Sequence, residues 1–193
     1  MRWLVVGLGN PGPAYAGTRH NAGAMTCQRL AEHTGGRLRG HRRAHAEVAE
    51  TRLQTQPLII AVPRSYMNES GGPVAALLAY YRVDLSHLIV CHDELDLPLG
   101  EVRLKHGGSD AGHNGLRSIR AALGSGEFLR CRVGIGRPLT GDPARYVLAP
   151  FPPPAQPALS AALDRAVTAL ETLMIDGLSQ AQQRFHGRSQ VEA

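Results

Sequence analysis

Short apolar runs alternate with longer amphipathic stretches along almost the whole chain. The apolar runs end at glycine, proline or charged residues and are too short for helices, which is typical of buried strands. The predicted strands span 2–8, 46–54, 58–62, 88–92, 101–105 and 128–135, and the predicted helices span 21–33, 74–81, 115–123 and 157–175. Strands that alternate with helices in this way fold into a three-layer α/β domain.

Two connections between predicted strands are too short for the crossover that parallel strands need. Residues 54–56 join two strands as a hairpin, and the turn at 97–100 leads directly into the strand at 101–105. The proline-rich segment 149–154 then separates the sheet from the C-terminal helix. We therefore predict a single three-layer α/β domain with a mixed, mostly parallel sheet flanked by helices, the C-terminal helix packed over one edge. Residues 187–193 are expected to form a frayed tail.

The size and composition are those of one globular domain, predicted as residues 1–193. A chain of 193 residues with 43% apolar content can bury about 70% of its unfolded surface, so no metal or disulfide is needed for stability. The cysteines Cys27, Cys91 and Cys131 are an odd number within apolar runs, which favours reduced, buried thiols. No apolar stretch reaches the roughly 18 residues of a membrane span. We expect a cytoplasmic monomer without membrane contact.

Basic residues are concentrated in one part of the chain. The net charge is +5, and the 21 basic residues comprise 20 arginines and Lys105. Segment 103–137 holds seven basic residues and two acidic ones, whereas 84–101 holds five acidic residues and no lysine or arginine. Such a distribution indicates a polyanionic partner. A second basic run, Arg37–Arg43, lacks apolar periodicity and is expected to be an exposed loop.

A glycine-rich loop follows the first predicted strand. Gly7-Leu8-Gly9-Asn10-Pro11-Gly12 matches the dinucleotide-binding pattern G-x-G-x-x-G, and Glu32 lies twenty residues beyond its third glycine. A nicotinamide-dependent oxidoreductase is therefore one hypothesis. However, Pro11 has no backbone N–H for a pyrophosphate, and Pro13 interrupts the expected helix. The pattern indicates instead a rigid loop that presents the amide of Asn10 at the end of a strand.

A histidine and a carboxylate follow two of the predicted strands. His20 lies at a loop-to-helix junction, and Asp93 belongs to a polar group, His92-Asp93-Glu94, at the end of a buried strand. A carboxylate that accepts an imidazole N–H fixes the tautomer and leaves the other nitrogen as a general base. The chain has no serine or cysteine in a nucleophile motif, so the base would activate water. Since His92, Asp93 and Glu94 alternate in direction along a strand, they do not form a metal site.

Two further polar loops follow predicted strands. Residues 105–115 are rich in glycine and open a helix, which indicates an anion site near Lys105 and the neighbouring arginines. Residues 66–72 add the aromatic ring of Tyr66 and the amide of Asn68.

Taken together, five motifs in this order resemble those of bacterial peptidyl-tRNA hydrolases. They are Gly7-Leu8-Gly9-Asn10-Pro11-Gly12, Thr18-Arg19-His20-Asn21, Tyr66-Met67-Asn68-Glu69-Ser70-Gly71, His92-Asp93-Glu94-Leu95-Asp96 and Gly112-His113-Asn114-Gly115-Leu116. The similarity extends from Met1 to Tyr146-Val147-Leu148, and only the C-terminal helix and tail are unspecific. The resemblance implies hydrolysis of the ester between a peptide and the 3′ ribose of tRNA, without metal or cofactor.

The resemblance also implies roles for particular residues. His20 would be the general base for water, Asp93 would orient it, and Asn10 would read the blocked amino end of the substrate. Asn68 and Asn114 would hold the terminal nucleotide and the peptide backbone, and Tyr15 and Tyr66 would line the groove for the 3′ end. Lys105 and Arg132 would contact tRNA phosphates, in agreement with the charge distribution.

One segment departs from the family pattern. Many relatives carry more glycine where this chain has Ser109-Asp110-Ala111-Gly112, and Asp110 adds a negative charge close to the expected anion site. This affects the expected flexibility of the loop and its affinity for tRNA. A non-catalytic RNA-binding protein on the same fold is the alternative function.

Overall fold

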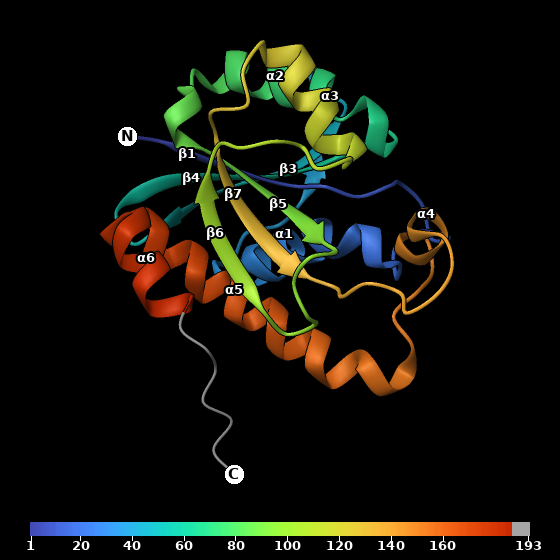
Figure 1. The fold of residues 1–193 in the computed structure, drawn as a ribbon. Coiled ribbons are helices and arrows are strands. Elements are labelled where there is room, and N and C mark those ends of the chain that lie inside the picture. Colours follow the sequence, from blue (N-terminus) through green and yellow to red (C-terminus); the bar gives the residue numbers. More distant parts are fainter. Residues whose placement is uncertain (187–193) are drawn as a thin grey trace.

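The computed structural model describes residues 1–186, which form a seven-stranded sheet covered by helices on both faces (Figure 1). The strands are β1 (Trp3–Gly7), β2 (Arg39–Gly40), β3 (Ala46–Leu53), β4 (Gln56–Pro63), β5 (Leu88–Glu94), β6 (Val102–His106) and β7 (Leu129–Gly134). The helices are α1 (Ala22–His33), α2 (Gly71–Tyr81), α3 (Asn114–Leu123), α4 (Pro143–Val147), α5 (Gln156–Asp176) and α6 (Leu178–Phe185). No helix in this part of the chain is long and apolar enough to cross a membrane.

The sheet is mixed, as predicted. Its order is β2-β3-β4-β1-β5-β7-β6, and the four central strands β4, β1, β5 and β7 are parallel. Antiparallel pairing is confined to the two sides, where β2 and β3 extend one edge and β6 forms the other. The predicted hairpin joins β3 to β4 through Gln54 and Thr55. The central strands therefore bring their carboxyl ends, and the loops that follow them, to one side of the molecule.

The two faces of the sheet carry different helices, as Figure 1 shows. Val5 belongs to a core shared with α1 and α5, whereas its neighbours Leu4 and Val6 belong to a core shared with α2 and α3. This alternation follows from the two-residue period of a strand. The C-terminal helices α5 and α6 both pack against β6, so they cover one edge of the sheet as expected.

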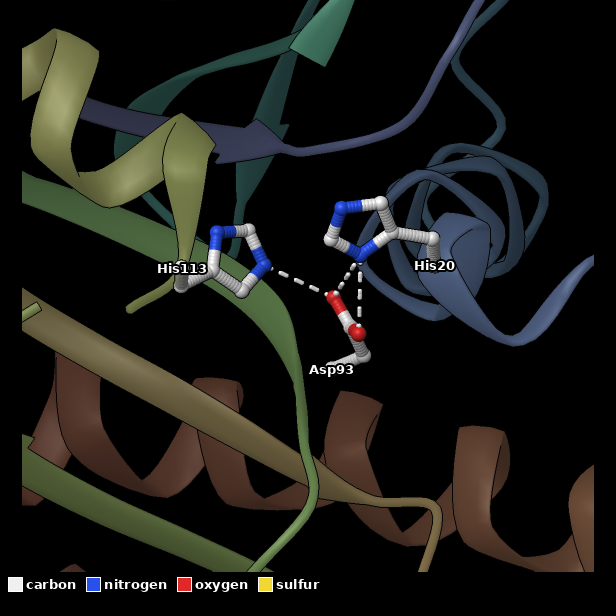
Figure 2. A group of neighbouring side chains, drawn as sticks. All are labelled: His20, Asp93 and His113. Carbon is white, nitrogen blue, oxygen red and sulfur yellow. Dashed lines mark hydrogen bonds and ion pairs between the residues drawn. The ribbon is translucent and has the colours of Figure 1, made fainter. Parts of the chain in front are cut away.

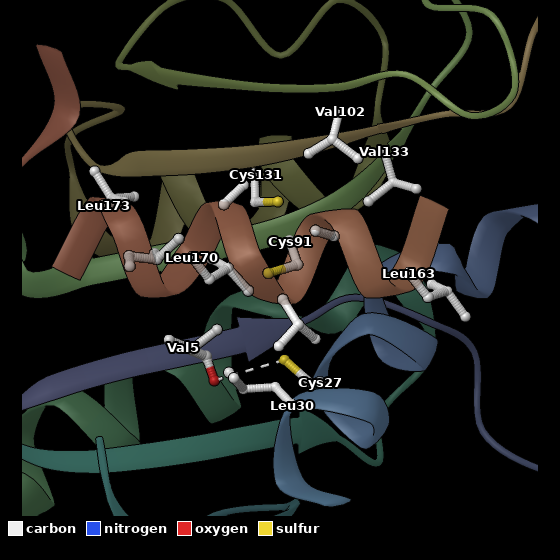
Figure 3. Packing of buried hydrophobic residues seen from close by; sticks show 14 of the residues in the cluster. Val5, Cys27, Leu30, Cys91, Val102, Cys131, Val133, Leu163, Leu170 and Leu173 are labelled. Carbon is white, nitrogen blue, oxygen red and sulfur yellow. Dashed lines mark hydrogen bonds between the residues drawn. The ribbon is translucent and has the colours of Figure 1, made fainter. Parts of the chain in front are cut away.

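The three cysteines lie in the core between the sheet and the helices α1 and α5 (Figure 3). Cys91 and Cys131 are neighbours on β5 and β7, and Cys27 projects from α1. All three are free and fully buried, which confirms the prediction of buried thiols. They act as small apolar side chains in the packing.

Two glycines allow α1 to lie unusually close to the sheet. A Cβ atom on Gly23 would be 2.1 Å from the carbonyl oxygen of Cys91, and one on Gly7 would be 2.3 Å from the carbonyl oxygen of Gly23. Any larger residue at either position would force α1 away from β1 and β5. Because His20 directly precedes α1, this contact places the histidine beside the end of β5.

The structure differs from the sequence prediction at several places. Arg39 and Gly40 were expected in an exposed loop, but they form the short strand β2 because their backbone pairs with Val48 and Glu47 of β3. The short helices α4 and α6 were not predicted. The glycine loop after β1 leads through a turn and the 3₁₀ helix Arg19–Asn21 to α1, so Gly12 lies outside α1 and the loop does not open a helix as a dinucleotide site would. The expected tail, 187–193, lies outside the described residues.

Candidate active site

A cavity of about 630 Å³ lies at the carboxyl ends of the central strands. Five parts of the chain surround it: the loops after β1, β4 and β5, the start of α3, and the helix α4. The polar lining residues include Asn10, His20, Asn68, Asp93, His113 and Asn114, and the apolar ones include Met67, Leu95, Ala144, Val147 and Leu148. Apolar walls with a few converging polar groups are typical of a small-molecule or catalytic site.

Asp93 and His20 form the predicted pair at this cavity (Figure 2). The Nδ1 atom of His20 lies 3.0 Å from Oδ1 and 2.9 Å from Oδ2 of Asp93. A carboxylate at this position accepts a proton from Nδ1, which fixes the tautomer and leaves the lone pair on Nε2. Nε2 has no hydrogen-bond partner within residues 1–186. His20 therefore has the arrangement of a general base that faces the cavity.

His113 binds the same carboxylate from the other side, a contact that the sequence did not predict. Its Nε2 lies 2.7 Å from Oδ1 of Asp93, and its Nδ1 accepts from the backbone N–H groups of Gly115 and Leu116 at the start of α3. Since Nδ1 accepts, the proton of a neutral His113 is on Nε2 and is donated to Asp93. The available signal was the position of His113 just before a predicted helix, where a side chain can cap the helix.

The two imidazoles change the acidity of Asp93. Its side chain is only 3% exposed. Burial by itself raises the pKa of the carboxyl, but the electrostatic and hydrogen-bond interactions with His113 and His20 outweigh burial and hold the pKa well below its usual range. Asp93 is consequently ionised at neutral pH and able to stabilise positive charge on His20.

His92 lies next to this group and stays neutral. It is 2% exposed, its Nδ1 donates to the carbonyl oxygen of Asp93 at 2.8 Å, and burial together with the nearby His113 lowers its pKa to about 3. Its Nε2 is buried and has no partner within the described residues.

Asn10 is held rigidly at the edge of the cavity. Its Oδ1 accepts from the backbone N–H of Met67 at 2.8 Å, and its backbone N–H and carbonyl oxygen bond the side-chain amide of Asn21 at 2.9 and 3.0 Å. Because Oδ1 is occupied, the amide nitrogen Nδ2 of Asn10 is the group left to interact with a ligand. Asn21, which follows His20 in the sequence, was not singled out as a site residue.

The other predicted residues of the groove divide into two groups. Asn68 and Asn114 line the cavity, as does Tyr66, whose side chain is 55% exposed. Tyr15 is not among the lining residues, but it packs edge-on against Tyr66 with ring centroids 6.4 Å apart. Tyr15 thus supports an exposed aromatic face next to the cavity.

Lys105 and Arg132 lie on β6 and β7 and are not among the residues that line the cavity. The Nε of Arg132 donates to Oε2 of Glu94 at 3.1 Å. Burial and the nearby positive charges of Arg132 and Arg130 lower the pKa of Lys105. Lys105 has no carboxylate partner within residues 1–186, which leaves its ammonium group available to a phosphate.

The loop before α3 is organised differently from the expected anion site. His113 already accepts from the first backbone N–H groups of α3. Arg117 pairs with Asp110 at 3.6 Å, and Asp110 also accepts from the backbone N–H of Gly112 at 3.0 Å, the main reason that its pKa is lowered. The charges near this loop are therefore largely satisfied by the protein itself.

Among the described residues, His20, Asp93 and His113 are the group that could hold a metal ion, with one ligand atom each within 4.8 Å of one another. Both histidine nitrogens are at hydrogen-bond distance from the carboxylate oxygens, 2.9 and 2.7 Å. This geometry is that of two imidazoles oriented by one carboxylate.

Known proteins of one family are similar to this chain over nearly its whole length. The family model described as peptidyl-tRNA hydrolase matches residues 4–193. A peptidyl-tRNA hydrolase of Frankia casuarinae is 57% identical over 95% of this chain and 93% of its own length, and one of Kineococcus radiotolerans is 50% identical over 95% and 96%. The crystal structure of the Acinetobacter baumannii peptidyl-tRNA hydrolase aligns with a TM-score of 0.90 and 34% identity, covering 96% of this chain and 94% of that one. This chain belongs to the peptidyl-tRNA hydrolase family.

Proposed function

We propose that this protein hydrolyses the ester bond between a peptide, or an N-blocked aminoacyl group, and the 3′ ribose of tRNA. Membership of the family supports the reaction. The observation that carries the mechanism is the pairing of His20 with Asp93, which leaves Nε2 of His20 unpartnered at a cavity of suitable size. The product would be free tRNA, available again for translation.

His20 is the general base in this proposal. Its Nε2 takes a proton from a water molecule as the water oxygen attacks the ester carbonyl, and Asp93 stabilises the imidazolium that forms. The tetrahedral intermediate then collapses, the C–O bond to the ribose breaks, and the proton on His20 passes to the leaving 3′ oxygen. The products are a carboxylic acid and a ribose hydroxyl, so the atoms balance without a cofactor.

Asp93 orients His20 only if the carboxylate itself is fixed, and this is the role we assign to His113. Its Nε2 binds Oδ1 of Asp93, while its Nδ1 is bound by the start of α3. The chain from α3 through His113 to Asp93 thus holds the base in place without contacting water directly.

Substrate recognition is assigned to the residues around the cavity. The Nδ2 of Asn10 donates to the blocked amino end, and Asn68 and Asn114 bind the terminal nucleotide and the peptide backbone. Tyr66, braced by Tyr15, offers a face for a base or a sugar. Lys105 contacts a phosphate of the tRNA, and Arg132 does so by exchanging its bond with Glu94 for one with phosphate.

We further propose that the protein acts as a monomer in the cytoplasm, where its substrate arises during translation. The buried, free cysteines are consistent with a reducing compartment. Analytical ultracentrifugation at micromolar concentration tests the monomer: a single species of about 20.7 kDa is expected, and a dimer would contradict it.

The reaction is tested with N-acetylated and unblocked aminoacyl-tRNA as substrates, with EDTA present throughout. We expect the acetylated substrate to be cleaved and the unblocked one to be spared, at a rate that EDTA does not change. Cleavage abolished by EDTA would contradict the metal-free mechanism. Salt-sensitive tRNA binding without any cleavage would instead establish the alternative, a non-catalytic RNA-binding protein.

A further inference from the structure

Arg19 directly precedes the proposed base in the sequence, and its side chain contacts the end of α4 and the residues after it. Its Nη1 donates to the carbonyl oxygens of Tyr146, Ala149 and Pro150 at 3.3, 3.3 and 3.2 Å. Its guanidinium carbon also lies 4.1 Å from the centre of the Tyr146 ring. One side chain thus holds the end of α4 and the segment that follows.

The backbone reinforces the same contact. The N–H of Arg19 donates to the carbonyl oxygen of Ala149 at 3.1 Å, and the N–H of Phe151 donates to that of Gly17 at 3.1 Å. Thr18 and Pro150 form an isolated antiparallel bridge between these bonds. The turn that carries His20 and the segment 146–151 are therefore joined side by side, although they are far apart in the sequence.

The segment held by Arg19 forms a substrate-facing wall. Pro143, Ala144, Val147 and Leu148 line the same cavity as His20. The helix is only five residues long, which is too short to be stable without tertiary contacts. A second anchor is the hydroxyl of Tyr146, which donates to the carbonyl oxygen of Ile135 at 2.7 Å. Arg19 and Tyr146 together set where this apolar wall lies.

The positive charge of Arg19 is compensated by groups other than a carboxylate. Within residues 1–186 it has no carboxylate partner, and its positive charge is met by three carbonyl dipoles and an aromatic face. A planar guanidinium can satisfy several carbonyls and stack at once, which neither an ammonium group nor a single amide can do. This requirement gives a reason for arginine in particular at position 19.

We propose that Arg19 is a positioning residue that fixes the α4 wall of the cavity against the turn carrying His20 and so prepares the substrate-binding conformation. This inference rests on the proposed function. His20 is oriented by Asp93 independently of the Arg19 side chain, so loss of that side chain leaves proton transfer intact. Loss of the Arg19 side chain lowers the fraction of molecules in which the α4 wall has its substrate-binding position. The apparent KM rises as that fraction falls.

The kinetic test compares Arg19→Gln and Arg19→Lys with the wild type on N-acetylated aminoacyl-tRNA. We expect KM to rise about tenfold for Arg19→Gln, less for Arg19→Lys, while kcat and its pH profile change less than about twofold. Arg29→Gln is the matched control, because Arg29 pairs with Asp164 on α5 and is not a cavity residue. A merely structural role predicts a lower kcat at unchanged KM, and that result would overturn the proposal.

A second variant tests whether Arg19 positions the α4 wall through its contact with Tyr146. Tyr146→Leu removes the ring that Arg19 covers and the hydroxyl that binds Ile135. If both residues act through one wall, the double variant Arg19→Gln/Tyr146→Leu will raise KM little more than the larger single effect. Independent, multiplicative effects on KM would argue against a shared wall.

Hydrogen–deuterium exchange tests the inference without any substrate. In Arg19→Gln we expect faster exchange of the amides in 143–151, including Ala149 and Phe151, with α1 and the central strands unchanged. Unaltered exchange in 143–151 would refute the positioning role even if the enzyme is active. If the wild type cleaves no ester while Arg19→Gln loosens this segment, the proposed function fails and the structural role of Arg19 stands.

Discussion

Asp93 is the side chain on which the geometry of the site depends most. It receives Nδ1 of His20 and Nε2 of His113, and it is nearly inaccessible to water. Replacing it with asparagine offers one acceptor atom instead of two. We expect Asp93→Asn to lower kcat by about 10² to 10⁴, as loss of general-base catalysis does, with a smaller change in KM. Single-turnover hydrolysis measures this, and an equal loss from Glu94→Gln, the neighbouring carboxylate, would contradict a specific role for Asp93.

His92 makes the stability of the protein sensitive to acid. Because burial lowers its pKa to about 3, the unfolded chain binds a proton at this histidine below about pH 6.5 and the folded protein does not. The free energy of unfolding therefore falls as the pH falls through this window, by about 1.4 kcal/mol per pH unit. Asp93 adds to the loss only below about pH 4, where the carboxyl of the unfolded chain takes up a proton.

Replacement of His92 by phenylalanine removes this titration. Urea unfolding at pH 7 and pH 5 should show that the wild type loses about 2 kcal/mol more than His92→Phe between the two values. His87→Phe, in the partly exposed 3₁₀ helix Leu85–His87 just before β5, is the control and should keep the wild-type dependence. Identical pH dependence in wild type and His92→Phe would show that His92 does not stay neutral in the folded protein.

The position of a single residue was predictable where the sequence around it predicts a strand or a helix. His20 and Asp93 each follow a predicted strand, so both were expected at the same edge of the sheet. His113 was missed because its contact with Asp93 depends on how the loop before α3 closes, which no local pattern specifies. Arg130 belongs to the basic segment 103–137, yet it is only 1% exposed, because its guanidinium donates to the carbonyl oxygens of Ser109 and Gly108, both at 2.7 Å.

Among the elements, α1 has the position that depends most clearly on one residue type, glycine. Gly23 lies against the carbonyl of Cys91 with no room for a Cβ. We expect Gly23→Ala to destabilise the protein by about 1 to 3 kcal/mol through overpacking and to lower activity, because the shift moves His20 relative to Asp93. Thermal unfolding and turnover measure both effects.

Gly72 provides the matched control for this substitution. It also lies in the first turn of a helix, α2, but a Cβ there meets nothing within 4 Å. Gly72→Ala should be neutral or slightly stabilising, because alanine favours the helix. If Gly23→Ala were as stable and active as Gly72→Ala, the close packing of α1 would not be what positions the histidine.

The main strands and long helices were predictable because their apolar periodicity is strong and their ends carry glycine or proline. The short elements were not. β2 exists only through pairing with β3, α6 covers an edge strand, and α4 depends on contacts with Arg19 and Ile135 that are distant in the sequence. Elements of a few residues take their stability from tertiary contacts, which composition does not reveal.

For the molecule as a whole, charges that are segregated along the chain meet in space. The acidic segment 84–101 supplies Glu94, Asp96 and Glu101, which pair with Arg132, Arg137 and Arg103 of the basic segment. The local excess of positive charge is thus smaller on the surface than in the sequence. The exposed pairs Arg137–Asp96 and Arg103–Glu101 contribute little to stability, but all three pairs reduce the number of free cations that a polyanion can reach.

Lys105 is therefore expected to carry more of the tRNA affinity than the sequence alone indicates. Lys105→Ala should weaken tRNA binding and reduce the slope of log Kd against log salt by about 1, since one phosphate contact is lost. Hydrolysis of a small aminoacyl ester fragment should be nearly unchanged. Arg52→Ala, at the end of the β3–β4 hairpin far along the chain from this segment, is the control and should leave the slope unchanged. Equal losses on tRNA and on the fragment would rule out a phosphate contact.

In the proposed mechanism, Nε2 of His20 accepts the proton of the attacking water. The most direct test is the rate of N-acetylated aminoacyl-tRNA hydrolysis by His20→Ala at saturating substrate, with and without added imidazole. We expect a rate at least 10² lower than that of the wild type and partial recovery with imidazole, while tRNA binding is retained. Near-normal turnover of His20→Ala would show that His20 is not the general base.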